Sequence, residues 1–196
     1  MKSKFLVSLL SLFLVPAASA ATYAENINGE LSRIHTSPTS FGLDLGSNRL
    51  SGSLTGNGID IDLFTLTVPA DAAITEIRII EFSGGGPSGS FLGFQPGSTL
   101  DAPPATAFAG GPIGYAIISP SNAAVDADVL GTITGGGLPF SGATSLPTGQ
   151  YAGWLNETGA GSTYTIDFVV SAVPEPSSGL LGLIGMALAV TRRKRG

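Results

Sequence analysis

Two stretches of the chain alternate between apolar and polar positions with a period of two residues, which is the pattern of a half-buried strand. The first covers residues 59–68 (IDIDLFTLTV), in which one face carries Asp60, Asp62, Phe64, Leu66 and Val68. A turn follows at Pro69 to Ala72, and residues 74–82 then alternate again. The pattern therefore predicts two strands joined by a turn.

Further short apolar runs predict the other strands. They cover residues 90–94, 113–118, 129–134, 150–156 and 163–170. Clusters of Gly, Pro, Ser and Asn separate these runs, and the body of the chain shows no sustained period of 3.6 residues. The less regular residues 22–45 leave room for one edge strand. Many short strands separated by turns are typical of an antiparallel, jelly-roll-like β-sandwich, and we predict an all-β protein of that kind.

The first twenty residues have the three parts of a secretory signal peptide. Two lysines precede an apolar run over residues 5–15, and Ala18 and Ala20 give the small-residue pattern of a cleavage site. We expect cleavage between Ala20 and Ala21. A membrane anchor is the alternative, but this run is too short to cross roughly 30 Å of hydrocarbon as a helix.

The other end carries a second three-part signal. Its successive residues are Val173, Pro174, Glu175 and Pro176, then an apolar run over residues 179–190, then Arg192, Arg193, Lys194 and Arg195. The basic cluster stays on the cytoplasmic side by the positive-inside rule. The apolar run is short for a spanning helix but can act as a stop-transfer segment. We predict a short transmembrane helix that holds the body transiently outside the inner membrane.

This order closely resembles the PEP-CTERM sorting signal of Gram-negative bacteria. The resemblance implies that an exosortase recognises the Pro-Glu-Pro and removes the tail after export. It also implies residence in the cell envelope, on the cell surface or in the extracellular matrix, in an exopolysaccharide or biofilm setting. An ordinary single-pass anchor is the alternative. The chain then divides into a signal peptide (1–20), a β-sandwich domain (21–172) and a sorting tail (173–196).

A second resemblance concerns the body. The segments that carry it are LSGSL (50–54), DIDLFTLTVPA (60–70), LPTGQY (146–151) and YTIDF (164–168). They resemble the bacterial pre-peptidase C-terminal domain, a small jelly-roll-like β-sandwich. That domain is often appended to secreted proteases, and some of its relatives bind calcium or collagen. Here it would stand alone, with a Gly/Pro-rich insertion near residues 83–112.

Composition removes several classes of site. The 196 residues contain no Cys and one His, which excludes disulfides, thiolate chemistry and any site that needs two imidazoles. The basic residues lie mostly in the two ends. Residues 21–173 hold three basic and thirteen acidic side chains, a net charge of −10. Such a body has no electrostatic footprint for nucleic acid and suits cations.

The residues do not assemble a catalytic pattern, and we expect no enzyme. His35 is the only imidazole, and no Gly-x-Ser-x-Gly sequence occurs. A loop histidine is the favoured interpretation, with an unfamiliar hydrolase that uses His35 or paired carboxylates as the alternative. Tyr151 and Trp154 could form a sugar-stacking platform. They are three residues apart and so point to opposite faces of a strand, which favours the core for one or both.

Calcium is the one cofactor for which the residues give a physical argument. Asp60 and Asp62 offer hard oxygen donors about 7 Å apart along one strand face. Asp126 and Asp128 repeat this spacing, without the remaining ligands of an EF-hand loop. In the competing interpretation, the acids mark solvated strand ends that discourage edge pairing. We predict a noncatalytic structural or adhesive protein; the alternative is a calcium-dependent module that binds sugar or protein.

Overall fold

The structure is a computed structural model that describes residues 20–56, 60–84, 89–101, 114–119, 126–135, 140, 142–157 and 159–173. Most of the predicted signal peptide and the tail from Pro174 onward, including the predicted transmembrane helix, lie outside these ranges. Inside them, no helix has the length and apolarity needed to cross a membrane.

The described residues are mostly strands. In chain order the elements are β1 (Thr22–Ala24), α1 (Glu25–Asn28), β2 (Thr39–Gly42), β3 (Gly46–Gly56), β4 (Ile61–Gly84), β5 (Ser90–Pro96), β6 (Gly114–Ile118), β7 (Ala127–Asp128), α3 (Leu130–Gly135), β8 (Leu146–Glu157) and β9 (Ala160–Ala172). The predicted all-β class is confirmed.

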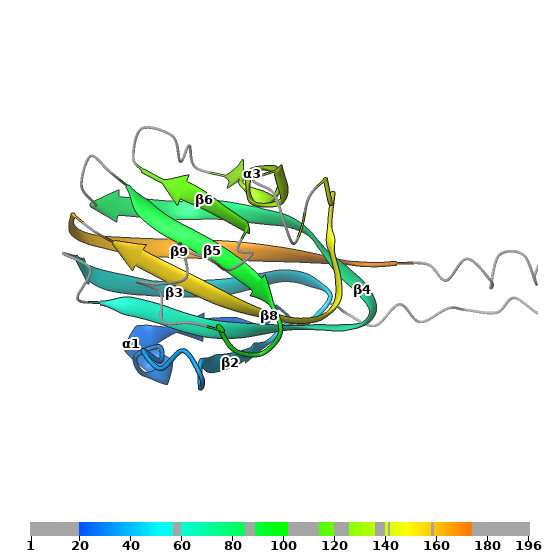
Figure 1. Cartoon of the computed structure of the whole chain (residues 1–196), viewed down its shortest axis with the longest axis horizontal. Helices are drawn as coiled ribbons and strands as arrows, with labels where there is room; N and C mark the ends of the chain where they lie inside the picture. Colours follow the sequence, from blue (N-terminus) through cyan, green and yellow to red (C-terminus); the bar gives the residue numbers. More distant parts are fainter. Residues whose placement is uncertain are drawn as a thin grey trace, which may run out of the picture.

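The sheet folds over on itself through β4. The hydrogen-bonded order is β1-β3-β9-β4-β8-β5-β6, and β2 and β7 also pair with β4. The first part of β4, Ile61 to Val68, pairs with β8, whereas the part from Ala72 onward pairs with β9. Figure 1 shows β4 bending between the two, so that β8, β5 and β6 lie across from β9 and β3. The result is a two-layered sandwich.

Aromatic side chains from both layers meet in the core between them. Phe64 of β4 and Phe94 of β5 each pack against Phe168 of β9, with ring centroids 6.2 Å apart in both pairs. All three rings are fully buried. A smaller cluster around Leu63 and Trp154 lies apart from this core, because these residues point from β4 and β8 in the opposite direction.

The turn predicted at Pro69–Ala72 is a bend within a continuous strand. Pro69 has no N–H to donate to a ladder, and Asp71 adopts a left-handed φ of 55°. The pairing with β8 shifts register between Val68 and Ala73. This irregularity lets one strand serve both layers.

The strand predicted at residues 129–134 is wrong, because the structure has helix α3 there. Asp128, two residues before Leu130, accepts a hydrogen bond from the Leu130 N–H at 3.0 Å and so satisfies one of the free N–H groups in the first turn of the helix. Leu130 and Ile133 are buried in the main core, at the spacing of one helical face. Tertiary burial thus overrides the β propensity of the Val-Leu-Gly-Thr-Ile-Thr run.

The N-terminal segment adds two parallel pairings to an otherwise antiparallel sheet. β1 runs parallel to β3, and β2 runs parallel to β4. The Tyr23 ring packs against Phe41 with centroids 6.4 Å apart, and Leu31 is buried in the main core. The segment that the sequence left irregular is therefore anchored on both layers, and it places α1 beside β3.

Candidate cation-binding site

The turn of helix α1 fixes the carboxylate of Glu25. The Ala24 N–H donates to the Asn28 side chain at 2.9 Å, and the Gly29 N–H donates to the Glu25 carbonyl oxygen at 2.9 Å. The carboxylate itself accepts backbone hydrogen bonds from Ser53 at 2.8 Å and Leu31 at 3.3 Å. The Glu25 side chain thus links α1 to Ser53 of β3 and to Leu31, which follows the helix.

Asp62 brings a second carboxylate to the same place from the sheet. It lies near the start of β4, on the same face as Phe64, and its side chain is fully buried. The Tyr164 hydroxyl of β9 donates to its Oδ2 atom at 2.6 Å. Its other oxygen, Oδ1, is buried and has no hydrogen-bond partner among the residues that the structure describes. A buried acceptor left unsatisfied in this way is unfavourable unless a further group binds it.

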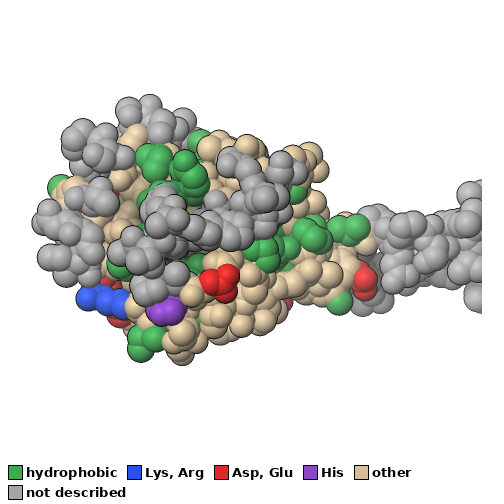
Figure 2. Space-filling view, in the orientation of Figure 1, with side chains coloured by type: hydrophobic (Ala, Val, Ile, Leu, Met, Phe, Trp, Pro, Cys, Tyr) green, Lys and Arg blue, Asp and Glu red, His purple; other side chains and the backbone are tan. Residues whose placement is uncertain are grey.

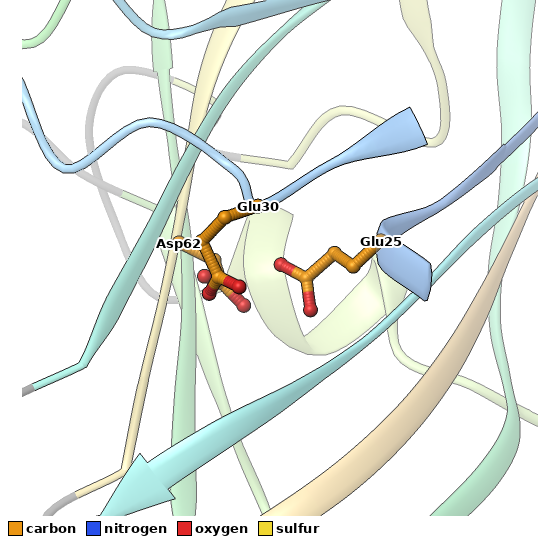
Figure 3. Close-up of side chains that lie close together, drawn as sticks. All are labelled: Glu25, Glu30 and Asp62. Atoms are coloured by element: carbon orange, nitrogen blue, oxygen red, sulfur yellow. The ribbon is translucent and has the colours of Figure 1, made fainter. Parts of the chain in front are cut away.

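Glu30 completes a group of three acids. One carboxylate oxygen from each of Glu25, Glu30 and Asp62 lies within 4.8 Å of the others. Figure 3 shows the Glu25 carboxylate extending toward those of Glu30 and Asp62. Oxygen ligands of one calcium ion lie about 2.3–2.6 Å from it and thus up to about 5 Å apart. The group therefore fits the donor set and the dimensions of a hard divalent cation.

Burial and like charge both act on these acids. Burial, which outweighs the Tyr164 hydrogen bond, raises the pKa of Asp62 to about 8, and the charge of Glu25 adds to the rise. Burial likewise raises the pKa of Glu25, while its hydrogen bonds from Ser53 and Leu31 oppose the rise. Burial and the facing Asp62 raise the pKa of the Tyr164 hydroxyl. At Asp62 and Glu25 the fold therefore favours the protonated form over the free negative charge.

Gly52 of β3 makes room for this arrangement. A Cβ atom at this position would overlap both the Glu25 carboxylate and the Tyr164 hydroxyl. Beside it lies a hollow of about 420 Å³ over β3 and β9. Its lining is mainly acidic and hydroxyl side chains, from Glu25, Asn26, Ser51, Ser53, Glu81, Thr163, Tyr164 and Thr165. Glu25 is thus shared between the acid group and this hollow.

Asp60 does not belong to this group, although the sequence pairs it with Asp62. Its carboxylate forms an ion pair with Arg33 at 2.6 Å and accepts two hydrogen bonds from Thr55, each of 3.0 Å. Asp60 is nearly buried, so neither aspartate marks a solvated strand end. The structure places Asp62 with Glu25 and Glu30 instead, two residues that sequence reasoning missed. The available signal was weak: two acids that flank the turn-forming Asn28-Gly29 pair.

The other residues singled out in the sequence serve the fold. The Asp128 carboxylate accepts hydrogen bonds from the N–H groups of Ile77 and Leu130. It therefore has a structural role in joining β7, β4 and α3. His35 Nδ1 lies 3.0 Å from the Leu100 carbonyl oxygen. Tyr151 is buried in the main core and Trp154 in the smaller cluster, on opposite faces of β8 as predicted.

Of the residues predicted for processing, the structure describes only those next to the domain: Ala20, Ala21 and Val173. The Ala21 carbonyl accepts a hydrogen bond from the Arg49 N–H at 2.9 Å, so the fold holds the first residue after the predicted cleavage. Val173 follows the last strand and is half-exposed. Ala18, Pro174 to Pro176 and the basic cluster at residues 192–195 lie outside the described residues.

Charged side chains are few and scattered on the face of the molecule shown in Figure 2. Backbone, uncharged polar and apolar groups make up most of what the described residues show on this face. In the described residues Arg33 and Arg78 each form an ion pair with an acid, Asp60 and Glu76 respectively.

The comparisons with known proteins concern the C-terminal end alone. The family model described as the PEP-CTERM protein-sorting motif matches residues 172–195. No curated protein and no solved structure matches the chain. The chain therefore ends in a PEP-CTERM sorting signal, which indicates an exosortase-sorted protein exported to the cell envelope or surface. The resemblance of the body to the pre-peptidase C-terminal domain stays a prediction.

Proposed function

We propose that the protein is a noncatalytic component of the envelope or extracellular matrix of a Gram-negative bacterium, with a structural or adhesive role beside exopolysaccharide. The observation that carries this proposal is the sorting signal at residues 172–195. A sandwich with an acidic, sparsely charged body is a suitable cargo for such a signal. The contact of His35 with the Leu100 backbone supports a structural role for the lone imidazole.

Intact mass measurement on fractionated native cells and medium tests whether both ends are processed and where the protein resides. We expect a species that begins at Ala21 and ends near Pro174, recovered from the envelope surface or the medium. Additional mass on that species would reveal a glycan or an attached anchor. A full-length tail retained in the inner membrane would instead describe a plain membrane-tethered domain and would end the matrix proposal.

Binding to exopolysaccharide tests the role. Purified mature protein is expected to co-sediment with the polymer isolated from the same bacterium, and a strain without the protein is expected to retain less polymer at its surface. A mature protein that stays in the supernatant, together with unchanged polymer retention, would contradict an adhesive role.

A second candidate is a calcium-dependent module that binds sugar or protein. The observation that favours it is the unpaired, buried Oδ1 atom of Asp62 inside a group of three acids. Glu25, Glu30 and Asp62 would hold the ion, which would neutralise their mutual repulsion and fasten α1 to the sandwich. The adjoining polar hollow would then receive the ligand.

Thermal unfolding with and without calcium tests this candidate. Millimolar calcium is expected to raise the Tm, and Glu25→Gln or Asp62→Asn is expected to abolish the rise. Gly52→Ala should weaken the rise by displacing the Glu25 carboxylate while leaving all three acids in place. Asp60→Asn is the matched control, because Asp60 pairs with Arg33 and should leave the calcium response unchanged. An equal Tm in calcium and in a chelator would remove the candidate.

A further inference from the structure

The sorting motif begins before the folded domain ends. The family match starts at Ala172, which is the last residue of β9 and pairs with Ala72 of β4. The next residue, Val173, donates its N–H to the Asp71 carbonyl oxygen at 2.7 Å. Pro174 follows and has no N–H to extend the ladder. The domain and the motif therefore share residues, with no linker between them.

The last two residues of β9 and the residue that follows are held differently from the rest of the strand. Val170 is the final residue whose side chain is buried in the main core. The side chains of Ser171, Ala172 and Val173 are exposed. These three residues are attached through backbone pairing and a contact of 3.1 Å between the Ser171 and Thr75 hydroxyls. A strand end without buried side chains can open locally while the core stays intact.

The distance to the membrane limits the space around the motif. Six peptide units connect Val173 to Gly179, where the predicted apolar run begins, and they reach at most about 20 Å when fully extended. A protein that binds an extended peptide by adding it to a sheet edge does so through backbone hydrogen bonds. In intact β9, the residues that precede Pro174 already use part of their backbone groups for pairing with β4.

We propose that Ala172 and Val173 belong to the segment that exosortase recognises, and that this segment becomes available only after it separates from β4 together with Ser171. The edge of β4 at Ala72 and Ala73 then competes with the enzyme for the same backbone groups. The strength of this pairing sets the rate of tail removal. The inference rests on the sorting signal and is independent of the adhesive role and of the cation site.

A reversible cross-link tests the separation step. The chain has no Cys, so Ala72→Cys with Ala172→Cys introduces a single defined disulfide between directly paired residues of β4 and β9. Pulse-chase labelling in the native host is expected to show tail removal slowed about threefold or more in the oxidised pair. A membrane-permeant reductant should restore the normal rate. The two single-cysteine variants are the controls and should match the unmodified protein.

An insertion tests the same step without a disulfide. Gly-Ser-Gly-Ser placed between Val170 and Ser171 keeps the recognised residues intact and frees them from their register with β4. Tail removal should accelerate by about threefold or more. The same insertion between Ser178 and Gly179 is the matched control, because it lengthens the path to the membrane and leaves β9 paired. It should not accelerate tail removal.

The outcomes separate the proposal from its rivals. Slower removal in the cross-linked chain and faster removal after the first insertion support it. An unchanged rate in both variants would overturn it, since the motif would then be accessible with β9 fully paired. Slower removal after the first insertion would mean that the enzyme binds the end of β9 while it is still paired with β4. Acceleration by both insertions would assign the limit to distance from the membrane. Each of these last two results also overturns the proposal.

Discussion

Asp62 and Phe64 lie two residues apart on the same face of β4, and neither exposes its side chain to solvent. Their surroundings differ completely. Phe64 meets the rings of Phe94 and Phe168 between the two layers. Asp62 meets the Tyr164 hydroxyl and the carboxylates of α1 and its following turn. On one face of β4, two successive side chains thus lie in an acidic group and in an aromatic core.

The comparison shows that equal burial has opposite energetic consequences for the two side chains. Removing an aromatic ring from water stabilises the fold roughly in proportion to the area buried. Removing a carboxylate from water is unfavourable unless a proton, a hydrogen bond or a cation compensates it. The sandwich therefore derives stability from Phe64, whereas the buried carboxyl group of Asp62 has a raised pKa.

Replacing Phe64 with Ala should produce the largest effect on stability. The change would leave a cavity between the two layers and remove the contacts with Phe94 and Phe168. The free energy of unfolding should fall by about 3–5 kcal/mol, measured by urea unfolding. Ile34→Ala is the matched control, because the Ile34 side chain is exposed, and it should change the stability little. A loss below about 1 kcal/mol for Phe64→Ala would show that this core is not packed as described.

Asp62 should make the stability of the cation-free protein depend on pH. Burial raises its pKa in the fold to about 8, against an ordinary value of 3.8. The folded state therefore binds a proton that the unfolded state has released across this interval. The stabilisation is complete below about pH 4 and is lost as the pH rises toward 8. Asp62→Asn keeps an acceptor for the Tyr164 hydroxyl and removes the titration.

Urea unfolding at several pH values in a chelating buffer measures this effect. We expect the unmodified protein to lose roughly 1–3 kcal/mol more than Asp62→Asn between pH 5 and 8. Glu25 contributes in the same direction, because burial also raises its pKa, so a shallow slope should remain in the variant. Parallel pH profiles for the two proteins would show that Asp62 is ionised in the fold.

Local patterns in the sequence predicted the faces of β4 but not what each face contacts. Side-chain direction alternates along a strand whatever lies opposite, so Phe64 and Leu63 were assigned correctly to different faces. The contacts come from distant parts of the chain: Glu25 from α1, and Tyr164 from β9, 102 residues after Asp62. One sequence alone carries no signal for such long-range pairings. This is why Asp60 and Asp62 look equivalent in the sequence and differ in the structure.

The same limit explains the errors in secondary structure. Residues 129–134 were predicted as a strand, but the chain forms α3 there, and the spacing of a helix brings Leu130 and Ile133 together to the main core. The Pro69 turn predicted a strand end, whereas pairing with β9 carries β4 onward into the second layer. The sorting signal, in contrast, was recognised from the sequence and is confirmed by the family match, because its three parts are contiguous in the chain.

The smallest effect on stability should come from breaking the ion pair between Arg33 and Asp60, a partner that Asp62 does not have. The Arg33 side chain is 53% exposed and the Asp60 side chain 4% exposed, so solvent weakens the attraction from one side. Asp60 also keeps its two hydrogen bonds from Thr55 when Arg33 is removed. Arg33→Ala should therefore lower the free energy of unfolding by about 1 kcal/mol or less. If urea unfolding shows a much larger loss, the arginine is essential to Asp60, and a buried aspartate on this face is costly even with hydrogen-bond donors. A small loss means instead that the two hydrogen bonds from Thr55 are enough to hold the Asp60 carboxylate. Asp62 lacks such support, because its Oδ1 atom has no donor among the described residues.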